Sequence, residues 1–270
     1  MSRLAIEFIC PFGMPPVEFI ELAARLECPV IGMAPAPIVT LPGLYPSWNL
    51  LEDAPLRREV MAALKTNGVE VALAEGFLIL PGMDAANHAA ALDLAAELGA
   101  GVVNACCLAP DMAGNAAGFA ALADMAAERG MKATVEYIPG MFIGNLPNTL
   151  ALLAEVNRTN AGLLIDAMHL YRSGATTADL AAIDPALIVH AQLCDVPMVS
   201  AFEVYADEAR YERLATGDGE LPLADFVAAL PANVTVGLEV PMREATLRGV
   251  SAEERLRPVL AKARALLGEV

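Results

Sequence analysis

The fold is decided by four related stretches: ATVEYIPG (residues 133–140), LLIDAMHLYRSG (163–174), IVHAQLCDVP (188–197) and TVGLEVP (235–241). Each is an apolar run of strand length with one polar group near its end. These groups are Glu136, Asp166, Gln192 and Glu239. Because the carboxyl ends of parallel strands meet at one edge of a sheet, the four side chains are expected to converge.

Outward from these stretches, the whole chain alternates short hydrophobic runs with helical patterns of ten or more residues. The alternation predicts βα units around a parallel sheet, and no change in composition marks a second domain. A doubly wound dinucleotide-binding fold is disfavoured because no G-x-G-x-x-G follows the first run. We therefore predict one α/β domain over residues 1–270, a single (β/α)8 TIM barrel. Its strands are expected at Leu4–Cys10, Pro29–Met33, Val69–Ala74, Gly101–Cys107, Lys132–Tyr137, Gly162–Asp166, Leu187–Leu193 and Thr235–Val240.

Helix boundaries are marked at two places. Asp53 followed by Pro55 predicts a helix start, and Gly68 predicts the end of the same helix. Ser251 with Glu254 is typical of a capping box at the start of the last helix.

Composition narrows the functional classes. A net charge of −16 disfavours binding to nucleic acid, and no apolar run is long enough to span a membrane. The N-terminus shows no signal peptide, and the five cysteines are odd in number and sit mostly in apolar runs. These features predict a cytoplasmic protein without nucleic-acid or membrane partners. The partner we expect is a small-molecule substrate, and a homodimer is left open as an assembly.

The polar groups at the strand ends point to a metal. A carboxylate in a strand that is buried on both faces is costly unless it is paired or metal-bound. Three converging carboxylates would also repel one another, and one divalent cation would offset two of the three charges. We therefore expect a single divalent-metal site.

The ordered set E-Y-x-P (136–139), D-x-x-H (166–169), H-x-x-x-x-D (190–195) and E-x-P (239–241) resembles the xylose isomerase-like TIM barrels, the sugar phosphate isomerase/epimerase group. The resemblance covers nearly the whole chain. It implies that Glu136, Asp166, position 192 and Glu239 bind the metal. It also implies that His169 binds substrate or metal, and we assign His169 a catalytic role.

Position 192 departs from the family. The common pattern V-H-x-H-L-K-D appears here as Val189 to Asp195 with Gln192 in place of the second His. An all-oxygen ligand set favours Mn²⁺ or Mg²⁺ over Zn²⁺. Loss of the ligand role at Gln192 is the alternative. His190 matches the first His but sits roughly 6.5–7 Å deeper along its strand, so we assign it to substrate binding.

Further candidates for substrate binding are Glu75 and Asn104 at the ends of their strands, and Tyr137 as part of an apolar wall. The segment Arg210 to Leu223 resembles the family's R-x-x-P-G-x-G stretch. Arg210 or Arg213 could anchor an anionic or hydroxylated substrate group, and we name Arg210 as the candidate.

The resemblance favours a divalent-metal-dependent isomerase or epimerase acting next to a carbonyl of a small sugar-like or cyclic substrate. Glu136 and Glu239 would move a proton between the two faces of an enediolate. The alternative is a metal-dependent dehydratase, because a Gln in this slot resembles 3-dehydroshikimate dehydratases. Endonuclease IV-type repair is disfavoured by the charge and by only three histidines. A non-catalytic binding barrel would hold no metal.

Overall fold

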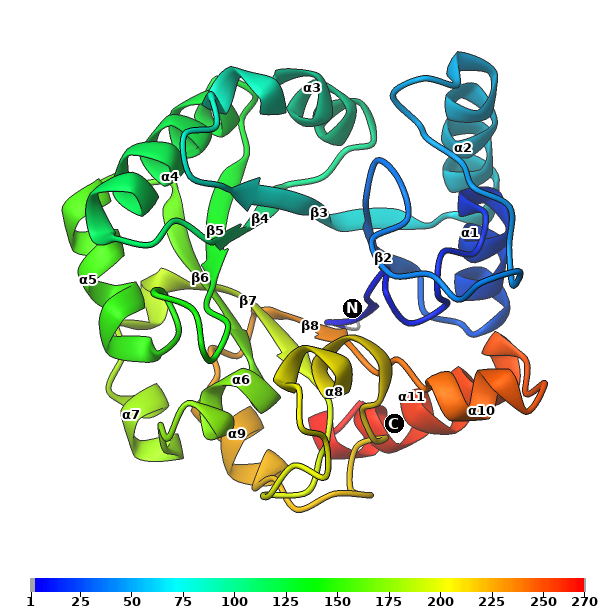
Figure 1. The fold of residues 1–270 in the computed structure, drawn as a ribbon. Coiled ribbons are helices and arrows are strands. Elements are labelled where there is room, and N and C mark those ends of the chain that lie inside the picture. Colours follow the sequence, from blue (N-terminus) through cyan, green and yellow to red (C-terminus); the bar gives the residue numbers. More distant parts are fainter. Residues whose placement is uncertain (1–2, 270) are drawn as a thin grey trace.

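The computed structural model describes residues 3–269 and shows a closed barrel of eight parallel strands in sequence order. Figure 1 looks into the barrel, with helices forming an outer ring around the strands. The prediction of a single (β/α)8 TIM barrel is confirmed. The strands are β1 (Leu4–Ile6), β2 (Val30–Met33), β3 (Glu70–Ile79), β4 (Val102–Cys107), β5 (Lys132–Glu136), β6 (Ala161–Asp166), β7 (Ile188–Leu193) and β8 (Thr235–Leu238).

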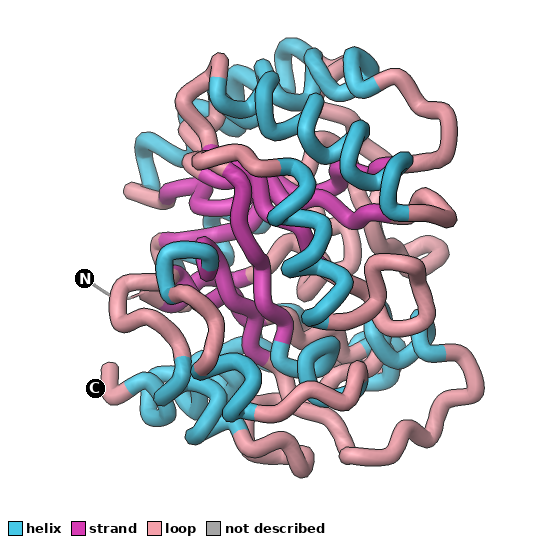
Figure 2. Tube along the Cα trace, turned by 90° about the vertical axis from the view of Figure 1, so that its left-hand side faces the viewer, coloured by secondary structure: helices cyan, strands magenta, loops and turns pink. Residues whose placement is uncertain are grey.

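Most connections contain a helix that packs against the outside of the barrel, and Figure 2 shows these helices around the strands from the side. The helices are α1 (Pro16–Arg25), α2 (Ala54–Asn67), α3 (Ala89–Glu97), α4 (Met112–Ala127), α5 (Leu146–Val156), α6 (Ala167–Arg172), α7 (Thr177–Ala181), α8 (Tyr205–Tyr211), α9 (Leu223–Ala229), α10 (Arg243–Leu247) and α11 (Ala252–Leu267), with 3₁₀ turns η1 (Ala85–His88) and η2 (Pro185–Leu187).

The predicted helix signals are confirmed. The Asp53 carboxylate accepts the Leu56 amide at the start of α2, and Gly68 closes that helix at φ 64°. Ser251 and Glu254 form the reciprocal capping box of α11. A glycine suits the end of α2 because its left-handed backbone is strained for other residues.

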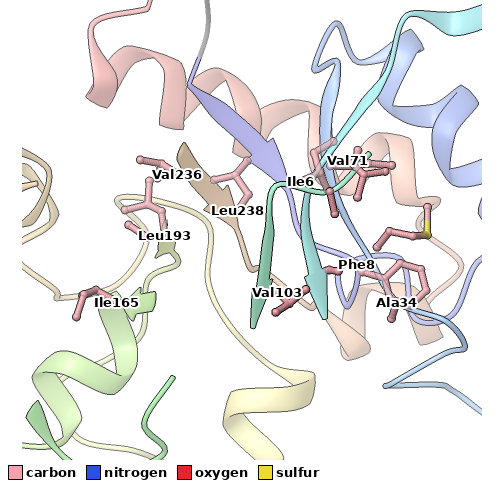
Figure 3. Close-up of a cluster of buried hydrophobic side chains, with 14 of the residues drawn as sticks. Ile6, Phe8, Ala34, Val71, Val103, Ile165, Leu193, Val236 and Leu238 are labelled. Atoms are coloured by element: carbon pink, nitrogen blue, oxygen red, sulfur yellow. The ribbon is translucent and has the colours of Figure 1, made fainter. Parts of the chain in front are cut away.

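Strand alternation directs the site residues inward. Ile165 and Leu238 are fully buried in the hydrophobic cluster of Figure 3, and each directly precedes a carboxylate, Asp166 or Glu239. Successive side chains on a strand point to opposite faces. Because Ile165 and Leu238 pack outward against the helices, the carboxylate that follows each of them points toward the barrel axis. The apolar layer between strands and helices thus fixes the orientation of the polar groups.

No helix among residues 3–269 is long and apolar enough to cross a membrane. All five cysteines are free thiols, and four of them are buried.

Candidate metal centre

Three carboxylates converge at the carboxyl ends of the strands. Glu136 ends β5, Asp166 ends β6 and Glu239 follows β8, and one oxygen from each lies within 4.8 Å of the others. Strand register brings Gln192 of β7 level with Asp166 of β6. The structure therefore brings together the four residues that the sequence predicted as ligands.

Gln192 presents an oxygen atom that is available to a cation. Gln192 is fully buried, its Oε1 has no hydrogen-bond partner, and its Nε2 lies 3.4 Å from Glu239 Oε1. An unpartnered buried amide oxygen costs free energy, which a bound cation would recover. The residues thus fit a divalent cation held by oxygen atoms, and Glu136, Asp166, Gln192 and Glu239 are the ones that would hold it.

Arg213 neutralises part of this acidic cluster. Its Nη1 donates to Asp166 Oδ2 at 2.5 Å and lies 2.7 Å from Glu239 Oε2, in an ion pair without hydrogen-bond alignment. Burial alone would raise the pKa of Asp166, but Arg213 and His169 together hold it below its ordinary value. Burial raises the pKa of Glu239 well above its ordinary value, although Arg213 opposes the rise. One guanidinium is shared by two acids and favours ionisation of Asp166.

The segment that carries Arg213 is held firmly. The carboxylate of Asp195 accepts the backbone amides of Val196, Gly217 and Leu221. Arg213 itself donates its backbone amide to Pro241 and its Nε to Ala209. Asp195, two residues after β7, therefore anchors the loop and fixes the turn that positions the buried guanidinium of Arg213.

Glu136 is oriented by a chain of hydrogen bonds along the barrel interior. The Thr134 hydroxyl donates to Asn104 Oδ1 at 2.9 Å, and Asn104 Nδ2 donates to Glu136 Oε2 at 2.8 Å. Both ends of the Asn104 amide are engaged. Substrate binding was our prediction for Asn104, but these contacts fit a positioning role for Glu136 more closely.

His169 links the centre to helix α8. Its Nε2 lies 3.4 Å from Glu136 Oε1, its Nδ1 lies 2.5 Å from the Tyr205 hydroxyl, and its backbone amide donates to Asp166. Asp166 is the N-cap of α6, so the local helix start places His169 over the carboxylates. Tyr205 had no sequence signal, because its position depends on how the segment after β7 folds back.

A cavity of about 220 Å³ opens over the centre. Most of the predicted site residues line it: Glu75, Asn104, Glu136, His169, Arg210 and Glu239, together with Arg213. A larger hollow of about 580 Å³ lies on the outer surface beside α5 and α7, and it is lined by none of the predicted residues. The smaller cavity is therefore the candidate functional site.

Two predicted substrate contacts lie elsewhere. His190 is 1% exposed, its Nε2 is 2.7 Å from Glu7 Oε1, and it does not line the cavity. Tyr137 is also 1% exposed and absent from the lining, because it follows Glu136 and points to the opposite face. Neither side chain reaches the space where a substrate would lie.

Glu7 was missed by the sequence reasoning. It follows β1, is fully buried, and packs against Glu75, where a Cβ on Gly32 or Gly237 would overlap its carboxylate. Burial raises the pKa of Glu7 to about 8, and burial lowers that of His190 to about 4. A lone carboxylate inside the apolar run LAIEFIC was the available signal.

Glu7→Gln is expected to reduce the fall in the free energy of unfolding that occurs as the pH rises from 6.5 to 8. The folded protein retains the Glu7 proton that the unfolded chain has released above pH 4.5, so the free energy of unfolding falls as pH rises toward 8. His190 acts in the opposite sense, but only between pH 4 and 6.5. Urea unfolding at pH 6.5 and 8 measures this fall, which should be about 1.5 kcal/mol smaller in the variant than in the parent. Equal declines in both proteins would refute this.

The comparisons with known proteins agree with the fold. The family model of the xylose isomerase-like TIM barrel matches residues 20–264, whereas no curated protein sequence matches the chain. Among solved structures, the IOLI protein with a binding zinc atom has a TM-score of 0.78 at 17% identity and covers 99% of both chains.

Two further structures share the fold. D-psicose 3-epimerase in the presence of D-fructose has a TM-score of 0.70 at 15% identity, covering 99% of this chain and 100% of its own. The probable 3-DHS dehydratase AsbF from Bacillus anthracis has a TM-score of 0.71 at 16% identity, covering 96% and 99%. At such identities these likenesses show the fold alone. The family model spans nearly the whole chain, and the chain belongs to the xylose isomerase-like TIM barrel family.

Proposed function

We propose that the chain is a divalent-metal-dependent isomerase or epimerase that moves a proton next to a carbonyl of a small hydroxylated substrate. The observation that carries the proposal is that Glu136 and Glu239 line one cavity, with a third carboxylate and the unpartnered Gln192 oxygen at the same strand ends. Two carboxyl groups from different strands can serve the two faces of a substrate carbon.

The chain's own residues supply the proton chemistry. Glu136 receives the proton from the substrate carbon, because the Asn104 amide stabilises and orients its carboxylate. Glu239 returns a proton to the other face. His169, held by Tyr205, lies beside Glu136 and can exchange a proton with a substrate oxygen. When bound, the cation would polarise the carbonyl and lower the cost of the negative charge that develops on its oxygen.

The oxygen donors favour Mn²⁺ or Mg²⁺ over Zn²⁺. A cytoplasmic location and a small-molecule substrate, without nucleic-acid or membrane partners, accompany the proposal. A homodimer stays a prediction.

A dehydratase is the second candidate. The structural likeness to the probable dehydratase AsbF and the Gln in the strand-seven slot favour it. His169 would then protonate a departing hydroxyl group. Hydroxy-ketones and cyclic hydroxylated acids, incubated with the Mn²⁺-loaded protein in D₂O, distinguish the two candidates. An isomer or epimer carries solvent deuterium and keeps its composition, whereas a dehydration product has lost one water. Absence of both products would refute both candidates.

Gln192→Leu is expected to weaken Mn²⁺ binding at least about tenfold, because removal of even an indirect partner of a ligand costs 10–100-fold. Leu has a similar volume but no donor atom. Gln192→His, measured by the same calorimetric titration, restores a donor and should shift preference toward Zn²⁺. Unchanged Mn²⁺ affinity in the Leu variant would show that Gln192 is not a ligand.

A further inference from the structure

Part of the lining of the cavity over the metal centre is apolar, and we call this part the apolar wall. Ile38 lines it from the segment after β2, Leu78 from within β3 and Met141 from the segment after β5. These three side chains remain 46%, 39% and 49% exposed. Val39, Phe77 and Ile138 extend the same wall. Large apolar side chains that are exposed around a concave site mark a surface whose burial by a ligand would be favourable in free energy.

This wall is a poor partner for a polyhydroxylated chain. Each sugar hydroxyl turned toward it would lose its water without gaining a hydrogen bond, at a cost in free energy. A hydrocarbon surface in the same place is stabilised by leaving water. The volume of about 220 Å³ also lies below the roughly 300–1,000 Å³ of sites for drug-sized ligands, so the ligand is small.

Helix α8 also lines the cavity. Ala206, Ala209 and Arg210 line it from one face of the helix, and Arg213 lines it from the segment just after the helix ends at Tyr211. Arg213 is buried and already pairs with Asp166 and Glu239.

Arg210 is different from Arg213. It is exposed, and its guanidinium has no ion pair or hydrogen bond to any residue within 3–269. A guanidinium presents a planar fork of donors that matches a carboxylate. The protein carries a net charge of −16, so its overall electrostatic field repels a small anion. Arg210 gives this cavity a positive group that would attract one.

We propose that the ligand of this cavity is a small carboxylate with a hydrocarbon body, its carboxylate held by Arg210 and its body against Ile38, Leu78 and Met141. The inference rests on the proposed function, since the same cavity would hold the reacting carbonyl. One free guanidinium matches one singly charged group. A phosphate ester carries about −1.5 to −2 and meets more repulsion from this acidic protein.

Three probes test the proposal by calorimetric titration of the full chain with saturating Mn²⁺: 4-methyl-2-oxopentanoate, its methyl ester and D-fructose. The acid is expected to bind more tightly than the ester or the sugar. Arg210→Met should weaken binding of the acid roughly 10–100-fold and leave the ester unchanged. Met141→Gln should weaken binding of both the acid and the ester, because it makes the wall polar.

Arg248→Met is the matched control, because Arg248 is exposed and lies outside the cavity lining. It removes the same charge and should leave all three affinities unchanged. The inference is overturned if the ester or D-fructose binds as tightly as the acid, if the acid does not bind at millimolar concentration, or if Arg210→Met leaves its affinity unchanged.

Binding and turnover can fail separately. Selective binding of the acid through Arg210, without deuterium exchange or dehydration in any substrate, would refute the proposed function and support this ligand class. Deuterium exchange into neutral hydroxy-ketones, without selective binding of carboxylates, would support the proposed function and refute this ligand class.

Discussion

Arg213→Met is expected to lower the free energy of unfolding of the metal-free protein by about 3–5 kcal/mol. Arg213 is 3% exposed and is the cation that pairs with both Asp166 and Glu239. Met fills a similar volume, so the loss comes from leaving buried carboxylates without a counter-charge. The midpoint of thermal unfolding should fall by roughly 10 °C, given 2–4 °C per kcal/mol for a chain of this size.

Arg210→Met is the matched control, three residues away, and should stay within about 0.5 kcal/mol of the parent, because that arginine is exposed and has no ion pair among residues 3–269. Added Mn²⁺ should stabilise the Arg213 variant more than the parent, since the cation replaces the missing positive charge. Urea unfolding with and without Mn²⁺ measures both effects. Equal stability of the two arginine variants would show that Arg213 does not balance the acidic cluster.

Glu136→Gln is expected to reduce solvent deuterium incorporation into substrate by roughly 10²–10⁴-fold, the range for loss of a positioned general base. The amide keeps the shape of the side chain and can still accept the Asn104 hydrogen bond. It cannot take a proton from carbon at neutral pH. The rate is measured by NMR at Mn²⁺ concentrations that saturate the variant, because the substitution also weakens a proposed ligand.

Glu70→Gln provides the comparison, since Glu70 is an exposed glutamate at the opposite end of β3 from the cavity. Its exchange rate should equal that of the parent. Undiminished exchange in Glu136→Gln would remove Glu136 from the role of base and leave His169 or Glu239 to be tested in the same way.

The order and number of strands followed from hydrophobic runs, but two predicted strand ends were wrong by more than two residues. The first strand was predicted over Leu4–Cys10, whereas β1 ends at Ile6 and the chain then turns. The third was predicted to end at Ala74, whereas β3 continues to Ile79 past a register shift. Gly76, at φ 93°, accommodates that irregularity. A glycine after a strand usually marks its end, and only the pairing with β4 shows otherwise.

Some of the site residues could likewise be predicted from the sequence, whereas others could not. Glu136, Asp166, Gln192 and Glu239 were predictable because each interrupts an apolar strand at its end. Arg213 could have been separated from Arg210 by counting back from Gly217 and Gly219, since the R-x-x-x-G-x-G spacing fits Arg213 alone. The burial of His190 against Glu7 was not predictable, because it depends on side chains of strands far apart in the sequence.

Glu7 occupies space that two neighbouring strands leave open by having no side chain at Gly32 and Gly237. Any larger residue at Gly237 would displace the carboxylate, and any shorter residue at position 7 would leave a void beside a glycine. The three positions should therefore be inherited as a unit. Among descendants of a common ancestor, a side chain at position 237 should appear only in lineages that have also given up the glutamate at position 7.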